Sequence, residues 1–243
     1  MDVLYYTNYD MQVDALLKGH IDIALHSPIA WVDTQHRSGG TCRAIAMRDS
    51  DLDRVAYIIV KKTSSLKRVE DMRDKTLAVD VLDSHQARLI SLAFLKDRGL
   101  ERDKDFTVKR FNPTVGNGKN GDFISGDMNA LKAVQRGQAD ASAMLDLNWD
   151  TWTKNGAINP SDYRFLATSE KSDHCVFALR QDFPRDVEQK WLKALFSMSY
   201  YNPKHREMIK LEGLTKWLPG RTSSFEPLVD AAKKLGYFEG HKI

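Results

Sequence analysis

Short apolar runs alternate with longer amphipathic segments along most of the chain, a pattern typical of an α/β protein. The apolar runs predict strands at residues 21–25, 42–47, 55–60, 77–81, 106–111, 139–144, 164–168 and 175–179, and a weaker strand at residues 3–6. Helical spacing predicts helices at residues 9–18, 28–32, 87–98, 127–136, 146–154, 185–200, 205–211 and 225–235. We therefore expect strands and helices to alternate until about residue 180, with helices dominating afterwards.

Two stretches share one arrangement of residues. Residues 133–144 read Ala-Val-Gln-Arg-Gly-Gln-Ala-Asp-Ala-Ser-Ala-Met, and residues 15–25 read Ala-Leu-Leu-Lys-Gly-His-Ile-Asp-Ile-Ala-Leu. In each, a helix ends in a basic residue and a glycine, and an apolar run carrying one aspartate follows. The pattern indicates two α/β lobes built to one plan. Two unrelated helix-to-strand turns would give the same pattern.

Polar segments place the boundaries between these lobes. Residues 63–73 are rich in serine and charged residues, and residues 169–173 form a second polar bend. We expect lobe 1 to contain residues 1–63 and 171–243, and lobe 2 to contain residues 64–170.

Composition excludes several classes of protein. Of the 243 residues, 42% are hydrophobic and 28% charged, and 36 Lys and Arg against 33 Asp and Glu give a net charge of +3. This balance does not favour a nucleic-acid partner. No apolar run reaches the roughly 18 residues of a membrane span, and no signal peptide is visible at the start. Cys42 and Cys175 lie in strand-like runs. Buried free thiols are the favoured state, and a disulfide between the two residues is the alternative.

Polar residues at predicted helix starts are the candidate binding residues. Asp83, Ser84 and His85 follow the strand at residues 77–81, and Asp127 follows a glycine-rich loop at residues 112–126. Open α/β sheets bind ligands where strands lead into helices, because unpaired amides point outward there. Helix capping alone would also explain Asp83, Ser84 and Asp127. The loop lacks the spacing of a phosphate-binding P-loop.

Metal binding and catalysis are weaker interpretations of the same residues. A mixed site of His26, His85, Asp127 and Asp173 lacks a close pair of His or Cys residues at ligand spacing. Ser84, His85 and Asp83 are sequence neighbours, which cannot easily form the relay of a catalytic triad. We therefore expect no metal, no cofactor and no enzymatic activity.

The order of several motifs resembles the phosphonate-type solute-binding proteins of ABC transporters, which have the type II periplasmic-binding fold. The motifs are Thr7-Asn8-Tyr9 before residues 15–24, the strand Ile58-Ile59-Val60-Lys61-Lys62 before residues 66–76, the helix start at residues 83–86, and residues 126–140. The resemblance implies two lobes of mixed sheets with helices on both faces and a ligand cleft at the hinge. It covers most of the chain, which starts too late to include the family's first strand and helix.

The resemblance also adds binding residues. It implies that Tyr9 contacts the ligand, that Asp173 receives an amine of the ligand, and that Asp146 lies near a polar ligand position. His26 and Ser27, at the end of the strand at residues 21–25, complete the candidate set. Where relatives place a Ser-Thr-Ser run this chain has Asp83-Ser84-His85, so we expect a pocket rich in carboxylates.

The expected function is the capture of a small polar ligand, phosphonate-like, amine-bearing or zwitterionic, by hinge closure for an ABC importer. The implied partner is a membrane permease, the implied location is periplasmic or extracytoplasmic, and the expected state is a monomer. The alternative is a ligand-sensing effector module of the same fold that serves a kinase or transcription regulator.

Overall fold

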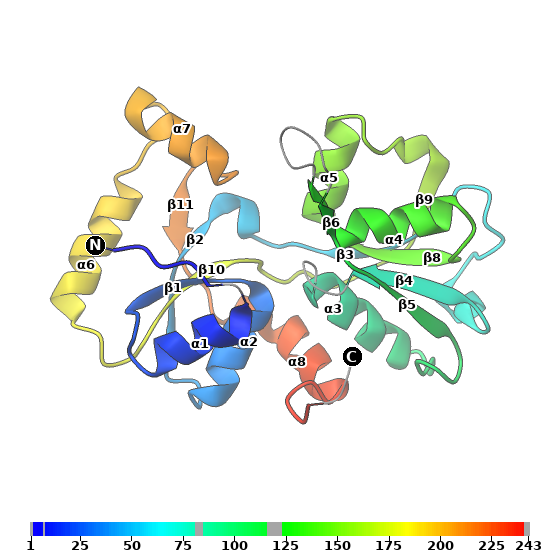
Figure 1. The fold of residues 1–243 in the computed structure, drawn as a ribbon, viewed down its shortest axis with the longest axis horizontal. Coiled ribbons are helices and arrows are strands. Elements are labelled where there is room, and N and C mark those ends of the chain that lie inside the picture. Colours follow the sequence, from blue (N-terminus) through cyan, green and yellow to red (C-terminus); the bar gives the residue numbers. More distant parts are fainter. Residues whose placement is uncertain (1, 7, 81–84, 116–122, 241–243) are drawn as a thin grey trace. The chain divides into compact units, whose positions relative to one another are not determined.

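The chain forms two compact units, each of which gathers segments far apart in the sequence (Figure 1). The computed structural model describes residues 2–6, 8–80, 85–115 and 123–240. Unit 1 contains residues 1–53 and 172–226, and unit 2 contains residues 54–171 and 227–243. The chain therefore passes between the units three times, after residues 53, 171 and 226.

Strands and helices are interspersed over the first three quarters of the chain, and helices dominate the rest. The helices are α1 (Tyr9–Leu17), α2 (Pro28–Arg37), α3 (His85–Lys96), α4 (Gly126–Gln135), α5 (Asp146–Lys154), α6 (Arg185–Phe196), α7 (Pro203–Leu211) and α8 (Glu226–Lys234), with 3-10 turns η1 (Asp49–Asp51), η2 (Val69–Met72), η3 (Pro160–Asp162) and η4 (Ser223–Phe225). The strands are β1 (Ile23–His26), β2 (Arg43–Arg48), β3 (Ala56–Lys61), β4 (Thr76–Asp80), β5 (Thr107–Phe111), β6 (Thr114–Val115), β7 (Phe123–Ile124), β8 (Ala141–Leu145), β9 (Tyr163–Thr168), β10 (Val176–Leu179) and β11 (Trp217–Pro219).

The sheet of unit 1 has the order β1-β10-β2-β11, and each neighbouring pair is antiparallel. Its core contains the fully buried side chains of Leu16, Trp31, Met47 and Phe225. The rings of Trp31 on α2 and Phe225 on η4 lie 6.0 Å apart. Residues from both ends of the chain therefore share one core.

The sheet of unit 2 is mixed and lies between helices on its two faces (Figure 1). Its order is β5-β4-β8-β3-β9; β4 runs parallel to β5 and β8, and β3 antiparallel to β8 and β9. Leu77 and Val79 pack in the cluster that contains Leu92 and Leu95 of α3. Ala78, between them, packs with residues of α4. The two-residue period of a strand thus supplies both faces with apolar side chains.

The unit boundaries differ from those expected from the sequence. The first boundary follows residue 53 and not residue 63, because β3 hydrogen-bonds to β8 and β9 of the unit 2 sheet. Residues 227–243 belong to unit 2 and not to the first lobe. Lys234, at the end of α8, pairs with Asp97 beyond α3, and Leu235 packs against the unit 2 core.

Most predicted elements are present, with a few corrections. Residues 3–6 do not form the expected strand, and Val3, Leu4 and Tyr5 are 61% to 94% exposed. The expected loop at residues 112–126 contains the paired strands β6 and β7, and β11 was not predicted at all. Asp127 does not cap α4, because Ser125 holds that position.

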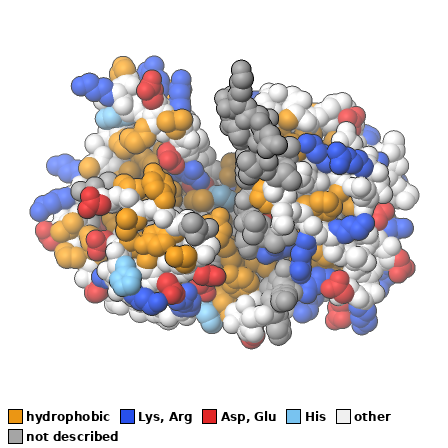
Figure 2. Space-filling model, in the orientation of Figure 1, with side chains coloured by type: hydrophobic (Ala, Val, Ile, Leu, Met, Phe, Trp, Pro, Cys, Tyr) orange, Lys and Arg blue, Asp and Glu red, His pale blue; other side chains and the backbone are white. Residues whose placement is uncertain are grey.

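The surface matches the balanced composition. Acidic and basic side chains are interspersed on the visible face of each unit in Figure 2. Among the described residues, no helix combines the length and the apolar character that crossing a bilayer would need.

Candidate functional site

The carboxyl ends of β4, β5 and β8 meet at one edge of the unit 2 sheet, because these three strands run parallel. Helices α3, α4 and α5 all begin after these ends, at His85, Gly126 and Asp146. The first amides of a helix lack partners within the helix and carry partial positive charge. We call this region the carboxyl edge of unit 2.

Asp127 connects two of these helix starts. Its carboxylate Oδ2 accepts hydrogen bonds from the backbone amide of Leu145, at 3.3 Å, and from the side-chain amide of Asn148, at 2.8 Å. Its own backbone amide donates to Ser125 Oγ at 3.3 Å, and its side chain is fully buried. Asp127 therefore fixes the start of α4 against the start of α5.

Gly126 lets the start of α4 approach the end of β4. A Cβ atom at this position would overlap the Asp80 carboxylate and lie 2.7 Å from the Phe111 carbonyl oxygen. Asp80 is 1% exposed and Arg88 is 5% exposed, and Arg88 Nη1 donates to the Asp80 carbonyl oxygen at 3.2 Å. Burial, with a contribution from Arg110, lowers the pKa of Arg88 to about 10, so its guanidinium stays charged at neutral pH.

Asp146 is the first residue of α5 and is 7% exposed. Its Oδ1 accepts a hydrogen bond from the Leu147 amide at 2.8 Å, and Oδ2 lies 3.7 Å from Arg54 Nη1. Burial raises the pKa of this carboxyl, while the Arg54 charge opposes the rise. The carboxyl edge thus contains side chains of both signs.

Three of the predicted residues fall wholly or partly outside the described part of the chain. Asp83 and Ser84 lie outside the described residues. His85 is the first residue of α3, but its side chain is not among those described.

His26 is a buried residue of the unit 1 core. Its ring Nδ1 lies 2.9 Å from Gln12 Oε1, and Nε2 lies 3.0 Å from Thr34 Oγ1. Gln12 Nε2 donates to the Leu25 carbonyl oxygen at 3.3 Å, which directs Oε1 toward the ring. The ring therefore donates through Nδ1 and accepts through Nε2 as a neutral imidazole. Burial lowers its pKa to about 3.

Tyr9 and Ser27 stand at the starts of α1 and α2 in unit 1. Ser27 Oγ caps α2 by accepting a hydrogen bond from the Ala30 amide at 3.4 Å. Tyr9 begins α1, which Asn8 caps, and its side chain is 38% exposed. Of the two, the local geometry gives Ser27 a capping role and leaves much of Tyr9 accessible.

Asp173 is fully buried and accepts hydrogen bonds from three neighbours in unit 1. Arg221 donates to both of its oxygens, through Nη2 at 2.5 Å and Nε at 2.8 Å. The Asp53 amide donates at 2.9 Å and Ser224 Oγ at 2.5 Å. Asp173 and these partners lie near the three points where the chain passes between the units, so Asp173 ties these chain segments together.

The structure brings some predicted residues together and separates others. Asp127 and Asp146 share the carboxyl edge of unit 2 with the start of α3, whereas Tyr9, His26, Ser27 and Asp173 belong to unit 1. Sequence reasoning missed Asp80 and Arg88 at the edge, although Asp80 lies in a predicted strand and is the last residue of β4. It also missed Arg221, which is 48 residues from Asp173 and has no local pattern that points to it.

A hollow of about 380 Å³ in unit 2 lies away from the carboxyl edge. Lys61, Lys62, Thr63, Gln135, Ser161, Asp162 and Tyr163 line it. It sits where β3 ends and β9 begins, and β3 runs opposite to β8. The hollow therefore lies at the other edge of the sheet, and none of the predicted binding residues lines it.

Comparison with known families gives a match over residues 1–225 to the ABC transporter, phosphonate, periplasmic substrate-binding protein family. The chain belongs to this family. Its family and structural neighbours are substrate-binding proteins without enzymatic activity. The predicted family and fold class are confirmed.

Solved structures share the fold at low sequence identity. PhnD1 of Prochlorococcus marinus, in complex with methylphosphonate, is 16% identical with a TM-score of 0.73, over 97% of this chain and 86% of that one. A Xanthomonas citri protein bound to ATP is 16% identical with a TM-score of 0.74, over 100% and 87%. The aliphatic sulphonate binding protein SsuA of Escherichia coli is 17% identical with a TM-score of 0.59, over 97% and 80%.

A curated relative matches over a short segment. An uncharacterized protein of Haemophilus influenzae is 44% identical over 43 residues, which are 18% of this chain and 61% of that protein. The match thus spans less than two thirds of that relative's length.

The buried neutral His26 makes stability dependent on pH. Its folded pKa of about 3 lies below the ordinary value of 6.5, so below about pH 6.5 the unfolded chain binds a proton that the folded chain does not. We expect the free energy of unfolding to fall as the pH drops from 7 to 4, by up to about 1.4 kcal/mol per pH unit from this group. In urea titrations His26→Gln should flatten this slope, whereas His20→Gln, at an exposed position, should keep it. An unchanged slope in His26→Gln would contradict the assignment.

Removing the arginine that holds Asp173 should destabilise unit 1. Arg221→Met leaves a buried carboxylate without its cation, which costs about 3–5 kcal/mol. Arg185→Met is the matched control, because its partner Glu188 keeps Arg43, which donates at 2.6 and 2.7 Å. The control should change the free energy of unfolding by less than about 1 kcal/mol. Equal losses in the two variants, measured by urea unfolding, would refute the role of Asp173.

Proposed function

We propose that this chain is the solute-binding component of an ABC importer, and that it captures a small polar molecule outside the cytoplasm. The family match over residues 1–225 carries this proposal. The shared fold with binding proteins solved with methylphosphonate and with those for sulphonates supports it. The permease of the importer is the proposed partner, and the proposed state of the binding component is a monomer.

The proposed ligand site is the carboxyl edge of unit 2. Helices α3, α4 and α5 begin there, and helix starts attract anions through their unpaired amides. This arrangement favours a ligand with a compact anionic group, such as a phosphonate or a sulfonate.

The charged side chains at this edge favour a ligand that also carries an amine. Asp80, Asp127 and Asp146 contribute negative charge, and Arg54 and Arg88 contribute positive charge. Two like charges 4 Å apart repel by about 4 kcal/mol at an effective dielectric constant near 20. A doubly charged anion alone would therefore meet repulsion from the carboxylates, which an ammonium group on the ligand would offset. We propose a small zwitterion as the ligand class.

Capture by hinge closure is part of the proposal. A ligand that contacts both units in one arrangement of the chain would shift the population toward that arrangement. Tyr9 and Asp173 of unit 1 stay proposed contacts on the strength of the family resemblance. Asp83, Ser84 and His85 stay proposed contacts because they stand at a predicted helix start.

The variant Asp127→Asn distinguishes a site for a zwitterionic ligand from a site for a plain anion. The variant removes the charge and keeps an oxygen that can accept from Leu145 and Asn148. We expect the affinity for an aminoalkylphosphonate to fall at least tenfold, or about 1.4 kcal/mol, and the affinity for methylphosphonate to rise, as measured by calorimetry. Asp103→Asn is the control, because it removes an exposed charge at a position with φ of 65°, which asparagine tolerates. Unchanged affinity for both ligands in Asp127→Asn would contradict the proposed site.

A further inference from the structure

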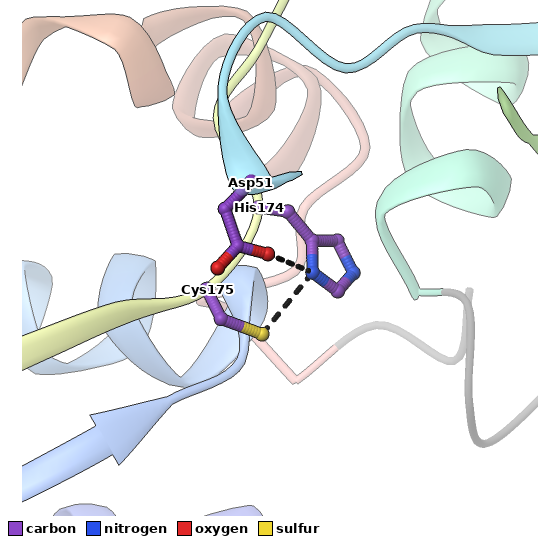
Figure 3. A group of neighbouring side chains, drawn as sticks. All are labelled: Asp51, His174 and Cys175. Atoms are coloured by element: carbon purple, nitrogen blue, oxygen red, sulfur yellow. Dashed lines mark hydrogen bonds and ion pairs between the residues drawn. The ribbon is translucent and has the colours of Figure 1, made fainter. Parts of the chain in front are cut away.

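Three side chains of unit 1, from two distant parts of the sequence, bring sulfur, nitrogen and oxygen together (Figure 3). His174 Nδ1 lies 3.1 Å from Cys175 Sγ and 3.2 Å from Asp51 Oδ1. The three potential ligand atoms all lie within 4.8 Å of one another. Asp51 is fully buried, His174 is 21% exposed at its side chain, and Cys175 is partly buried as a free thiol.

Backbone pairing fixes the positions of these side chains. Asp51 ends the turn η1 after β2, and Cys175 immediately precedes β10, which pairs with β2. The His174 amide donates to the Asp51 carbonyl oxygen at 2.9 Å. The three residues are therefore held in place by the sheet and do not depend on a flexible loop.

The geometry does not suit a catalytic relay. In a Cys-His-Asp relay the imidazole uses one nitrogen for the nucleophile and the other for the carboxylate. Here the sulfur and the carboxylate both approach Nδ1, and the second ring nitrogen points away from them in Figure 3. Three potential metal-ligand atoms that lie this close to one another could instead surround a metal ion.

We propose that Asp51, His174 and Cys175 bind a zinc ion, with the fourth position open to water. Zinc takes thiolate, imidazole and carboxylate ligands at about 2.3, 2.0 and 2.1 Å, in tetrahedral geometry. Tetrahedral angles then separate the ligand atoms by roughly 3.3–3.6 Å. The two contacts at Nδ1 need to widen by only a few tenths of an ångström. Thiolate with imidazole also favours zinc over magnesium or calcium, which prefer oxygen ligands.

Arg48 supports the carboxylate of this site. Its Nε donates to Asp51 Oδ2 at 2.6 Å, and its Nη2 donates to Oδ1 at 2.9 Å. Outer hydrogen bonds of this kind orient a ligating carboxylate. The guanidinium charge also opposes a second cation, which limits the affinity of the site.

Zinc binding also requires the loss of protons. Zinc takes a thiolate and an unprotonated ring nitrogen, so Cys175 Sγ and His174 Nδ1 must both be free of a proton in the zinc-bound state. The affinity for zinc should therefore rise with pH.

The site lies beside the first two passages of the chain between the units. Asp51 is two residues before Asp53, and Cys175 is two residues after Asp173. The Asp53 amide donates a hydrogen bond to the Asp173 carboxylate. Bound zinc would reinforce the fold of unit 1 there. This inference does not rest on the proposed solute or on the importer.

Zinc titration of the full chain, reduced and freed of metal with a chelator, tests the proposal. Equilibrium dialysis should show one equivalent of zinc bound to the wild type. Cys175→Ser and His174→Gln should each weaken binding at least tenfold. Cys42→Ser, which removes the other free thiol of unit 1, should bind zinc as the wild type does.

Cobalt supplies a second readout that depends on the sulfur. The wild type and Cys42→Ser should show thiolate-to-cobalt charge-transfer absorption, and Cys175→Ser should lose it while keeping the circular dichroism of the folded chain. His174→Gln covers the case in which Cys175→Ser fails to fold. Absence of stoichiometric zinc binding in the wild type, or its retention in folded Cys175→Ser or His174→Gln, would overturn the proposal.

Discussion

The parallel course of β4, β5 and β8 is the constraint on which the proposed binding site depends. Because these strands share a direction, the helices that follow them all begin at one edge of the unit 2 sheet. Gly126 permits the close approach of α4 to Asp80, and Asp127 holds the starts of α4 and α5 together. The partial positive charges of the helix starts and the buried carboxylates are therefore concentrated in one place by the topology itself.

The buried carboxylates make hydrogen bonds within the protein that stabilise its fold without any ligand. Asp127 accepts from an amide and a side chain within unit 2, and Asp173 is held by Arg221, Ser224 and the Asp53 amide. Such partners satisfy the oxygens of a buried carboxylate and fix it in position. The proposed preference for a zwitterion follows from charges that the protein already maintains without a ligand.

Local patterns predicted the elements well, because helix and strand periods are local properties. Residues 133–144 predicted the end of α4 and the strand β8, and the apolar run at residues 55–60 predicted β3. The sheet to which β3 belongs was not predictable in this way, since its partners β8 and β9 lie far away in the sequence. The strand β11 escaped prediction because Trp217–Pro219 is short and ends in proline.

Residues of the candidate site could be predicted from local sequence only where a polar side chain stands at the end of a strand or the start of a helix. Asp127 was identified because it stands at a predicted helix start, and Asp146 because the family resemblance implied it. The structure places both at the carboxyl edge. The pairing of Asp173 with Arg221 and the meeting of Asp51 with His174 join residues 48 and 123 positions apart, so no sequence spacing indicates them. His26 was expected to contact a ligand, but both of its ring nitrogens make hydrogen bonds inside the unit 1 core.

Hydrogen exchange of the backbone amides tests the central claim most directly. The full chain would be compared with and without whichever aminoalkylphosphonate, aminoalkylsulfonate or amino acid raises its melting temperature most. We predict slower exchange at the first amides of α3, α4 and α5, with smaller changes along the opposite edge of the unit 2 sheet. Protection confined to the hollow beside Lys61 and Tyr163, or to surfaces outside the carboxyl edge, would contradict the account.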